Sequence, residues 1–363
     1  MRTFRCKCGN RLFFESSQCV ACARVVRFCP TCRQVTAMEE SDEPGVLRCG
    51  DPACQARLAR CANDLEHGVC NRAIALMPGV QPDPSWRCDC CLFNHTIPDL
   101  SIAGNREKWY RLEAAKRRMF YDLETLGLPI GAPVGLPLSF DFKEDLPRDD
   151  TAWWRMDEGE RVYTGHAGGK ITINLREAEP VERERLRESL GEAHRTLIGH
   201  FRHEFGHYYW ETLVRGRPDV EAACARHFGD PYNPPYDQAL AVYYERGAPA
   251  NWHQHYVSRY ATMHPWEDFA ETFAMYLDMI ASLDTAWHLE FVENPPADFD
   301  AMIATFRELS LAMNEMNRTM GLVDLAPGLL TPPVVEKMRY IHGLLTAAAQ
   351  GQSLPWSDTR RAG

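Results

Sequence analysis

The sequence predicts an α+β protein in which cysteine-rich modules precede a mainly helical domain with a small β-sheet. Thirteen of the 14 cysteines lie before residue 92. Two later segments alternate apolar and polar residues as short strands do, and much of the remaining chain has helical periodicity. Because 363 residues exceed the size of one ordinary core, we expect more than one domain.

The first part of the chain is defined by its cysteines and the next by an apolar repeat. The cysteine-rich region extends over residues 1–98. Residues 105–126 then repeat apolar side chains at three- and four-residue steps, and Gly127 follows as a stop signal. This pattern predicts an amphipathic helix in a connecting segment, residues 99–127. The second domain is expected to comprise residues 128–363.

Two strands and several helices are predicted in the second domain. The strand candidates are residues 138–142 and 170–175. Residues 180–214 have helical character, with a break near Gly191. Further helices are predicted over residues 217–227, 235–246, 251–261, 265–282, 297–315 and 332–349.

Composition and charge exclude some classes of partner. The net charge is −10, and neither part of the chain is a basic arm that could hold nucleic-acid phosphates. We therefore do not expect nucleic acid as a partner. No stretch approaches 18 apolar residues, and the first residues lack the apolar segment of a signal peptide. These absences predict a cytoplasmic protein with no membrane partner.

The cysteines before residue 92 form three groups of four, with Cys90 left over. Because no export signal precedes them, metal binding explains these pairs better than disulfides do. Each group can close a tetrahedral four-thiolate zinc site, which supplies folding energy that about 30 residues lack. Ligands could interleave, or His67 or His95 could replace a cysteine, so two to three structural ions are expected. The groups are Cys6, Cys8, Cys19 and Cys22; Cys29, Cys32, Cys49 and Cys54; and Cys61, Cys70, Cys88 and Cys91.

A second kind of metal motif lies in the predicted helix near residue 200. His203 and His207 are one turn apart, so both imidazoles can reach one ion. Glu204, beside the first histidine, can take a proton from metal-bound water. Zinc fits because a catalytic site needs three protein ligands and an open position. A pattern this short also occurs by chance, but Gly206 costs a helix about 1 kcal/mol and indicates a close approach.

The third ligand is expected downstream of this helix. No histidine stands at the next defined place, since Leu213 occupies it. The segment from Tyr260 to Glu271 is the best candidate, with Pro265 as the first residue of a helix. Glu267 and Glu271 then share one face, which suits one carboxylate on the metal and one on a ligand histidine. The alternative is that these acids only favour the start of the helix.

Five segments resemble a bacterial family of zinc-binding metallopeptidases with an N-terminal zinc ribbon. The resemblance covers nearly the whole chain and implies a zincin-like metallopeptidase fold after the ribbon. The matching segments are residues 199–210, 260–273, 109–117, 127–129 and 171–175.

The motifs are also similar to the gluzincin domain of anthrax lethal factor. That similarity implies that His203, His207 and Glu267 bind one catalytic zinc and that Glu204 is the general base. It implies further that Glu271 orients His203. Tyr260 would stabilise the oxyanion, although a tyrosine at this distance from a ligand could equally be a packing residue.

The sequence therefore predicts a zinc-dependent endopeptidase acting on a protein or peptide substrate. One alternative is a zinc-ribbon module that binds protein or nucleic acid, with a non-catalytic peptidase-like domain. Another is an isopeptidase or other amidase, which the sequence does not separate from the first. Cys90 and Cys224 are expected to bind no metal.

Overall fold

The computed structural model describes residues 2–132, 135–145, 162–190, 196–293, 296 and 298–349, with only the backbone for residues 186–190. The chain forms two compact units. The first comprises Met1–Phe120, Ser139–Thr164 and Thr172–Glu179, and the second comprises Tyr121–Leu138, Gly165–Ile171 and Pro180–Gly363. The division falls within helix α2 (Asn105–Thr125), the helix predicted for the connecting segment.

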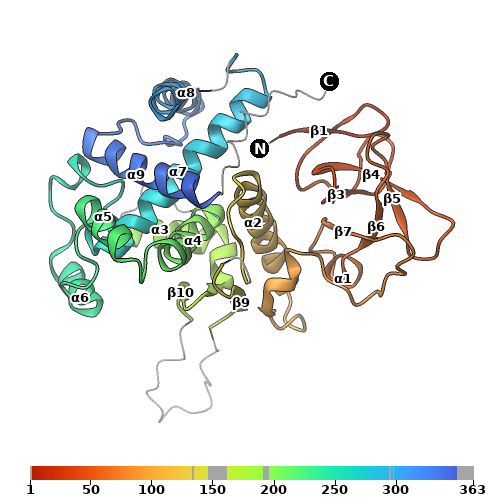
Figure 1. Ribbon diagram of the computed structural model, residues 1–363, viewed down its shortest axis with the longest axis horizontal. Helices are drawn as coiled ribbons and strands as arrows, with labels where there is room; N and C mark the ends of the chain where they lie inside the picture. Colours follow the sequence, from red (N-terminus) through yellow and green to blue (C-terminus); the bar gives the residue numbers. More distant parts are fainter. Residues whose placement is uncertain are drawn as a thin grey trace, which may run out of the picture. The chain divides into compact units, whose positions relative to one another are not determined.

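The first unit consists mainly of short strands (Figure 1). It also contains short 3₁₀ helices at Cys91–Phe93 and Leu175–Ala178. Its other elements are β1 (Phe4–Arg5), β2 (Arg11–Leu12), β3 (Val26–Cys29), β4 (Gln34–Glu40), β5 (Leu47–Cys49), β6 (Arg57–Arg60), α1 (Ala62–Leu65), β7 (Ala73–Ala75), β8 (Asn94–Thr96), β9 (Ser139–Lys143) and most of β11 (Lys170–Asn174).

The main sheet of this unit is an antiparallel meander with the order β3-β4-β5-β6-β7. One of its buried clusters contains sulfur: Cys29 and Cys49 are fully buried beside Leu58 and Ala73. A metal ion bound by such buried cysteines would contribute to folding.

A buried polar cluster joins α2 to β8 within the first unit. Glu113 and Lys116 are completely buried, and their charges pair at 3.0 Å. Asn94 donates to Glu113 at 2.6 Å, and the Trp109 indole donates to the same oxygen at 3.1 Å. Because every charge here has a partner, the cluster avoids the cost of an isolated buried ion.

Among its described residues, the second unit has helices and a hairpin formed by β10 and the first residues of β11. Two 3₁₀ turns, Trp252–Gln254 and Tyr260–Thr262, lie between its helices. Its other elements are β10 (Gly165–Ala167), α3 (Pro180–Leu190), α4 (Leu197–Leu213), α5 (Pro218–Phe228), α6 (Tyr236–Arg246), α7 (Pro265–His288), α8 (Phe299–Thr319) and α9 (Pro332–Ala348).

Helix α7 is the centre of this unit and packs against α4, α5, α8 and α9 (Figure 1). It begins as predicted: Pro265 is its first residue, and His264 caps it by accepting the backbone N–H of Trp266. Gly206 brings α4 very close to it. A Cβ at this position would lie 2.7 Å from Cα of Ala270, so only glycine allows this approach.

Most predicted elements of the second domain are confirmed. Both strands and the helices near residues 218, 236, 265, 299 and 332 form. The predicted helix 180–214 is two helices, and the expected break at Gly191 lies outside the described residues.

The prediction of a helix over residues 251–261 is wrong. The segment forms two separate 3₁₀ turns, because Ser258 accepts the backbone N–H of Ala261 and starts a new turn.

Within the described part of the chain, no helix combines the length and apolarity needed to cross a bilayer.

Candidate metal centre

Helix α4 presents His203, Glu204 and His207 toward α7. The helix begins at a capped end, where the Thr196 hydroxyl accepts the backbone N–H of Gly199. One turn separates the two histidines, and their rings lie 4.7 Å apart. Both imidazoles therefore face one point, as the spacing of the two histidines in the sequence predicted.

Glu267 on α7 completes a set of three ligand atoms. Its Oε2 lies 3.0 Å from Nε2 of His203 and 3.4 Å from Nε2 of His207. The two Nε2 atoms are 3.0 Å apart. The structure thus brings together the three residues predicted to bind zinc, and their ligand atoms all lie within 4.8 Å of one another.

The second carboxylate of α7 contacts the opposite side of the first histidine. Oε1 of Glu271 lies 2.6 Å from Nδ1 of His203. If Nδ1 carries the proton, then Nε2 presents its lone pair to the other two ligand atoms. Burial lowers the pKa of His203, but the hydrogen bonds to Glu267 and Glu271 outweigh it and raise that pKa.

This arrangement fits a cation. Electron-rich atoms of His203, His207 and Glu267 converge in a buried place, where a positive charge, carried by a proton or a metal ion, is needed to offset their mutual repulsion. Two imidazoles and one carboxylate are also a known catalytic zinc ligand set. Burial would raise the pKa of Glu267, but the adjacent histidines outweigh that effect and lower it, so its carboxylate is charged.

Glu204 lies beside this ligand set and is free for another role. Its Oε2 is buried and has no hydrogen-bond partner among the described residues. Burial raises the pKa of Glu204. A raised pKa brings a carboxylate closer to the range in which it can accept and return a proton near neutral pH.

Tyr260 lies at the edge of the centre. It begins a 3₁₀ turn, and its ring centroid is 6.1 Å from that of His203. Burial and the neighbouring Glu267 raise the pKa of Tyr260, so its hydroxyl keeps its proton and can donate. Its role as an oxyanion donor stays a prediction.

Three aromatic residues at the site were not predicted. The Tyr236 hydroxyl, at the start of α6, donates to Oε1 of Glu267 at 2.9 Å. The ring of Trp266 lies 3.7 Å from the ring of His207, and the ring of His166 on β10 lies 6.5 Å from it. Only Trp266 had a sequence signal, since it directly precedes a predicted ligand.

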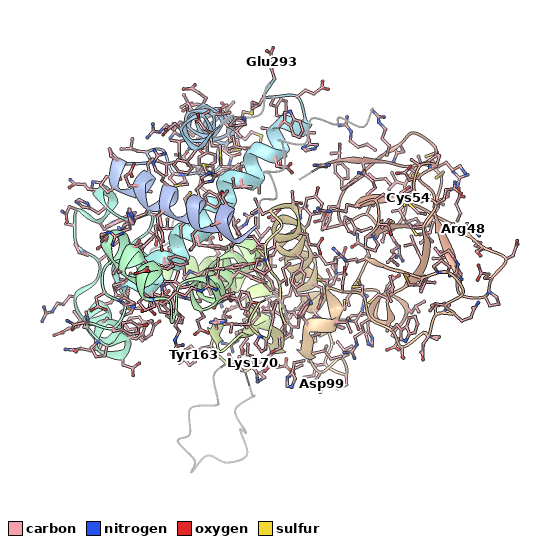
Figure 2. All side chains as sticks on the ribbon, viewed as in Figure 1. Arg48, Cys54, Asp99, Tyr163, Lys170 and Glu293 are labelled. Carbon is pink, nitrogen blue, oxygen red and sulfur yellow. The ribbon has the colours of Figure 1, made fainter. Side chains whose placement is uncertain are left out.

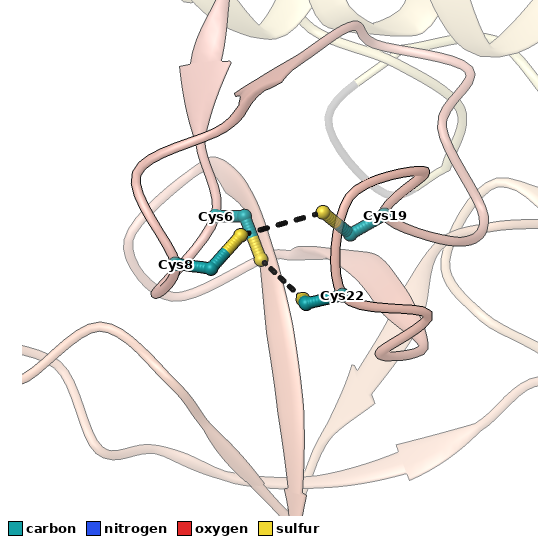
Figure 3. Close-up of side chains that lie close together, drawn as sticks. All are labelled: Cys6, Cys8, Cys19 and Cys22. Carbon is teal, nitrogen blue, oxygen red and sulfur yellow. Dashed lines mark hydrogen bonds between the residues drawn. The ribbon is translucent and has the colours of Figure 1, made fainter.

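The structure also brings together each predicted group of four cysteines. In the first group, Sγ of Cys6 is 3.7 Å from that of Cys22, and Sγ of Cys8 is 3.6 Å from that of Cys19 (Figure 3). Two loops contribute one pair of cysteines each, so four sulfur atoms face a common centre. This is the arrangement that a tetrahedral zinc ion requires.

The other two groups differ from the first in exposure. In the second, Cys29 and Cys49 are buried, and Cys54 is half-buried beside β5 (Figure 2). All four cysteines of the third group are buried, and Sγ of Cys70 is 3.7 Å from that of Cys88. Cys8 of the first group, by contrast, is exposed.

The residues left out of these groups have other surroundings. Cys90 and Cys224 are buried and belong to none of the clusters found in the described parts of the chain. His95 pairs with Asp141 at 2.8 Å, and the His67 ring packs against Trp109 at 5.5 Å. Neither histidine replaces a cysteine.

Two family models match the chain. Residues 105–344 match the family described as "Putative zinc-binding metallo-peptidase". The chain belongs to this family. Residues 3–102 match a zinc-ribbon domain, which accounts for the cysteine clusters of the first unit. Together the two matches identify a member of a zinc-binding metallopeptidase family with an N-terminal zinc ribbon.

Relatives occur in mycobacteria. Proteins of Mycobacterium tuberculosis and Mycobacterium bovis, both named as uncharacterized, are 36% identical to this chain over 364 residues. Each alignment covers 96% of this chain and 96% of the relative. No solved structure matches the chain.

Proposed function

We propose that this protein is a gluzincin-like endopeptidase that uses one zinc ion at His203, His207 and Glu267. The observation that carries the proposal is the convergence of these three side chains beside the unpaired carboxylate oxygen of Glu204. Such a zinc ion would supply Lewis-acid chemistry, polarising a scissile carbonyl and a water molecule.

The chain's own residues would move the proton and hold the geometry. Glu204 takes a proton from the attacking water and returns it to the leaving amine. Glu271 keeps the His203 ring in one orientation through the contact at Nδ1. Tyr260 donates a hydrogen bond from its hydroxyl to the oxyanion that develops on the carbonyl.

We further propose one structural zinc ion for each of the three cysteine groups. Each group offers four sulfur atoms, and no further ligand joins any of them within the described residues. The ribbon then serves as a metal-stabilised platform, and the substrate is a protein or peptide in the cytoplasm.

Glu204→Gln tests the catalytic assignment. The variant should keep its zinc and lose peptide hydrolysis by about 10²–10⁴-fold, because the amide cannot accept the proton. Hydrolysis is measured on a broad peptide library, and zinc is counted per chain. Glu211→Gln, on the same helix and paired with Arg215 at 3.4 Å, is the matched control and should remain active.

Two results would contradict the proposal. One is a Glu204→Gln variant that cleaves peptides as fast as the parent. The other is a His203→Ala variant with the same zinc content as the parent, which would favour a binding protein over an enzyme. An active parent also allows the inactive Glu204→Gln chain to trap cellular substrates for mass spectrometry.

A further inference from the structure

Tyr236 contacts Oε1 of Glu267, whereas the two histidines lie nearest to Oε2. Its hydroxyl donates to Oε1 at 2.9 Å, while Oε2 lies 3.0 Å from Nε2 of His203. The two oxygens of one carboxylate therefore face different groups. Glu267 is only 2% exposed, so water does not readily replace the tyrosine.

The tyrosine ring is itself held in place by the first turn of α7. It packs edge-on against His264 at 5.3 Å and against Trp266 at 5.8 Å. These two residues precede Glu267 in the chain, and His264 caps the helix. The hydroxyl is thus directed at Glu267 by groups that belong to the same turn as Glu267.

The chemistry of carboxylate ligands shows why this contact matters. The terminal torsion of glutamate is broad and roughly two-fold, so the side chain does not fix its own oxygens. A donor on Oε1 selects the orientation in which Oε2 faces the histidines. It also occupies the oxygen that could otherwise turn toward the open position that a catalytic metal site needs.

We propose that Tyr236 is a positioning residue for the metal centre, holding Glu267 with only Oε2 directed at His203 and His207. This inference rests on the proposed metal site and adds a residue that lies 31 positions before Glu267 in the chain. Loss of such a contact to a metal ligand reduces metal affinity by about 10–100-fold.

The test compares zinc affinity in the full-length chain. The zinc fraction missing from His203→Ala first identifies the ion of this centre, and competition with a chelator then gives its affinity. Tyr236→Phe keeps the ring packing and should bind this ion about 10–100-fold more weakly. Tyr244→Phe, on the same helix and 69% exposed, is the matched control and should bind it as the parent does.

Two further measurements separate positioning from a general loss of structure. Tyr236→Phe should keep the circular dichroism spectrum and the zinc content of the cysteine clusters. Tyr260→Phe, which leaves the contact between Tyr236 and Glu267 in place, should weaken zinc binding less than Tyr236→Phe does.

Parent-like zinc affinity in Tyr236→Phe would overturn the proposal. If His203→Ala lost no zinc, both this inference and the proposed function would fail. An active Glu204→Gln variant together with weak zinc binding by Tyr236→Phe would reject only the catalytic mechanism.

Discussion

His203 is held between two carboxylates of a single helix: Glu267 lies 3.0 Å from its Nε2, and Glu271 lies 2.6 Å from its Nδ1. Because these glutamates are one turn apart on α7, the helix fixes both nitrogens of the same ring. Helix α7 thereby determines both the orientation of the His203 ring and which of its nitrogens carries the proton.

Glu271→Ala should weaken zinc binding at this centre by about 10–100-fold, because the Nδ1–H of His203 loses its acceptor. Competition with a chelator measures the effect. Glu308→Ala, an exposed position on α8, serves as a control that should change nothing. Unchanged affinity in Glu271→Ala would show that the contact does not orient the ligand.

Gly206→Ala should lower the free energy of unfolding by about 1–3 kcal/mol, the usual cost of overpacking. The added Cβ would lie 2.7 Å from Cα and 3.0 Å from the carbonyl oxygen of Ala270. Gly343→Ala is the matched control, because nothing lies within 4 Å of its Cβ on helix α9. It should stabilise the protein by about 0.5–1 kcal/mol. Urea unfolding measures both, and a stabilised Gly206→Ala variant would contradict the close contact.

His342 should make stability depend on pH. Burial and the nearby Arg339 lower the pKa of His342, and its Nδ1 lies 2.9 Å from the Tyr276 hydroxyl. The unfolded chain therefore binds the proton more readily. The contribution of neutral His342 to the free energy of unfolding is complete above the ordinary histidine pKa of about 6.5. This contribution is lost as pH falls below that value.

The comparison is between the parent and His342→Gln. The parent should lose more unfolding free energy than the variant between about pH 7.5 and about pH 5.5, the range in which histidine titrates. Urea unfolding at both pH values gives this difference, in which effects common to both chains cancel. Equal losses would show that His342 does not titrate with unfolding.

Chelation should remove zinc from the first cysteine group before the third. Cys8 is exposed and Cys22 half-buried, whereas Cys61, Cys70 and Cys88 are buried. The chelator therefore reaches the zinc ion of the first cysteine group more easily than that of the third. A time course of zinc release, with alkylated cysteines mapped by mass spectrometry, gives the order.

Cys224→Ser should leave the zinc content unchanged, because Cys224 lies in none of the described clusters. Alkylation of the third group at or before the time of the first would contradict the expected order.

Each pair at the candidate site could be predicted because its signals are local. His203 and His207 are one turn apart, and so are Glu267 and Glu271, so a helix alone places each pair on one face. The cysteine groups were proposed similarly from the spacing of their pairs. That Glu267 meets His203 and His207 at one ion was implied by the resemblance to gluzincins, because spacing alone does not bring two distant helices together.

Contacts between segments that are distant in the sequence could not be predicted from local spacing. Tyr236 reaches Glu267 only because the chain returns after α6, and nothing near Tyr236 indicates a metal ligand. His166 approaches His207 from a short hairpin strand for the same reason. In residues 251–261, local hydrogen bonding by Ser258 prevailed over the helical periodicity.

The buried cysteines of the first unit have a consequence for how the protein matures in a cell. Cys29 and Cys49 lie in the interior, where a bound zinc ion would link strands β3 and β5. A ligand that binds only the folded state shifts the folding equilibrium according to its free concentration. We therefore expect the yield of folded protein to follow the zinc supply during synthesis, so that a zinc-starved cell would degrade newly made chains.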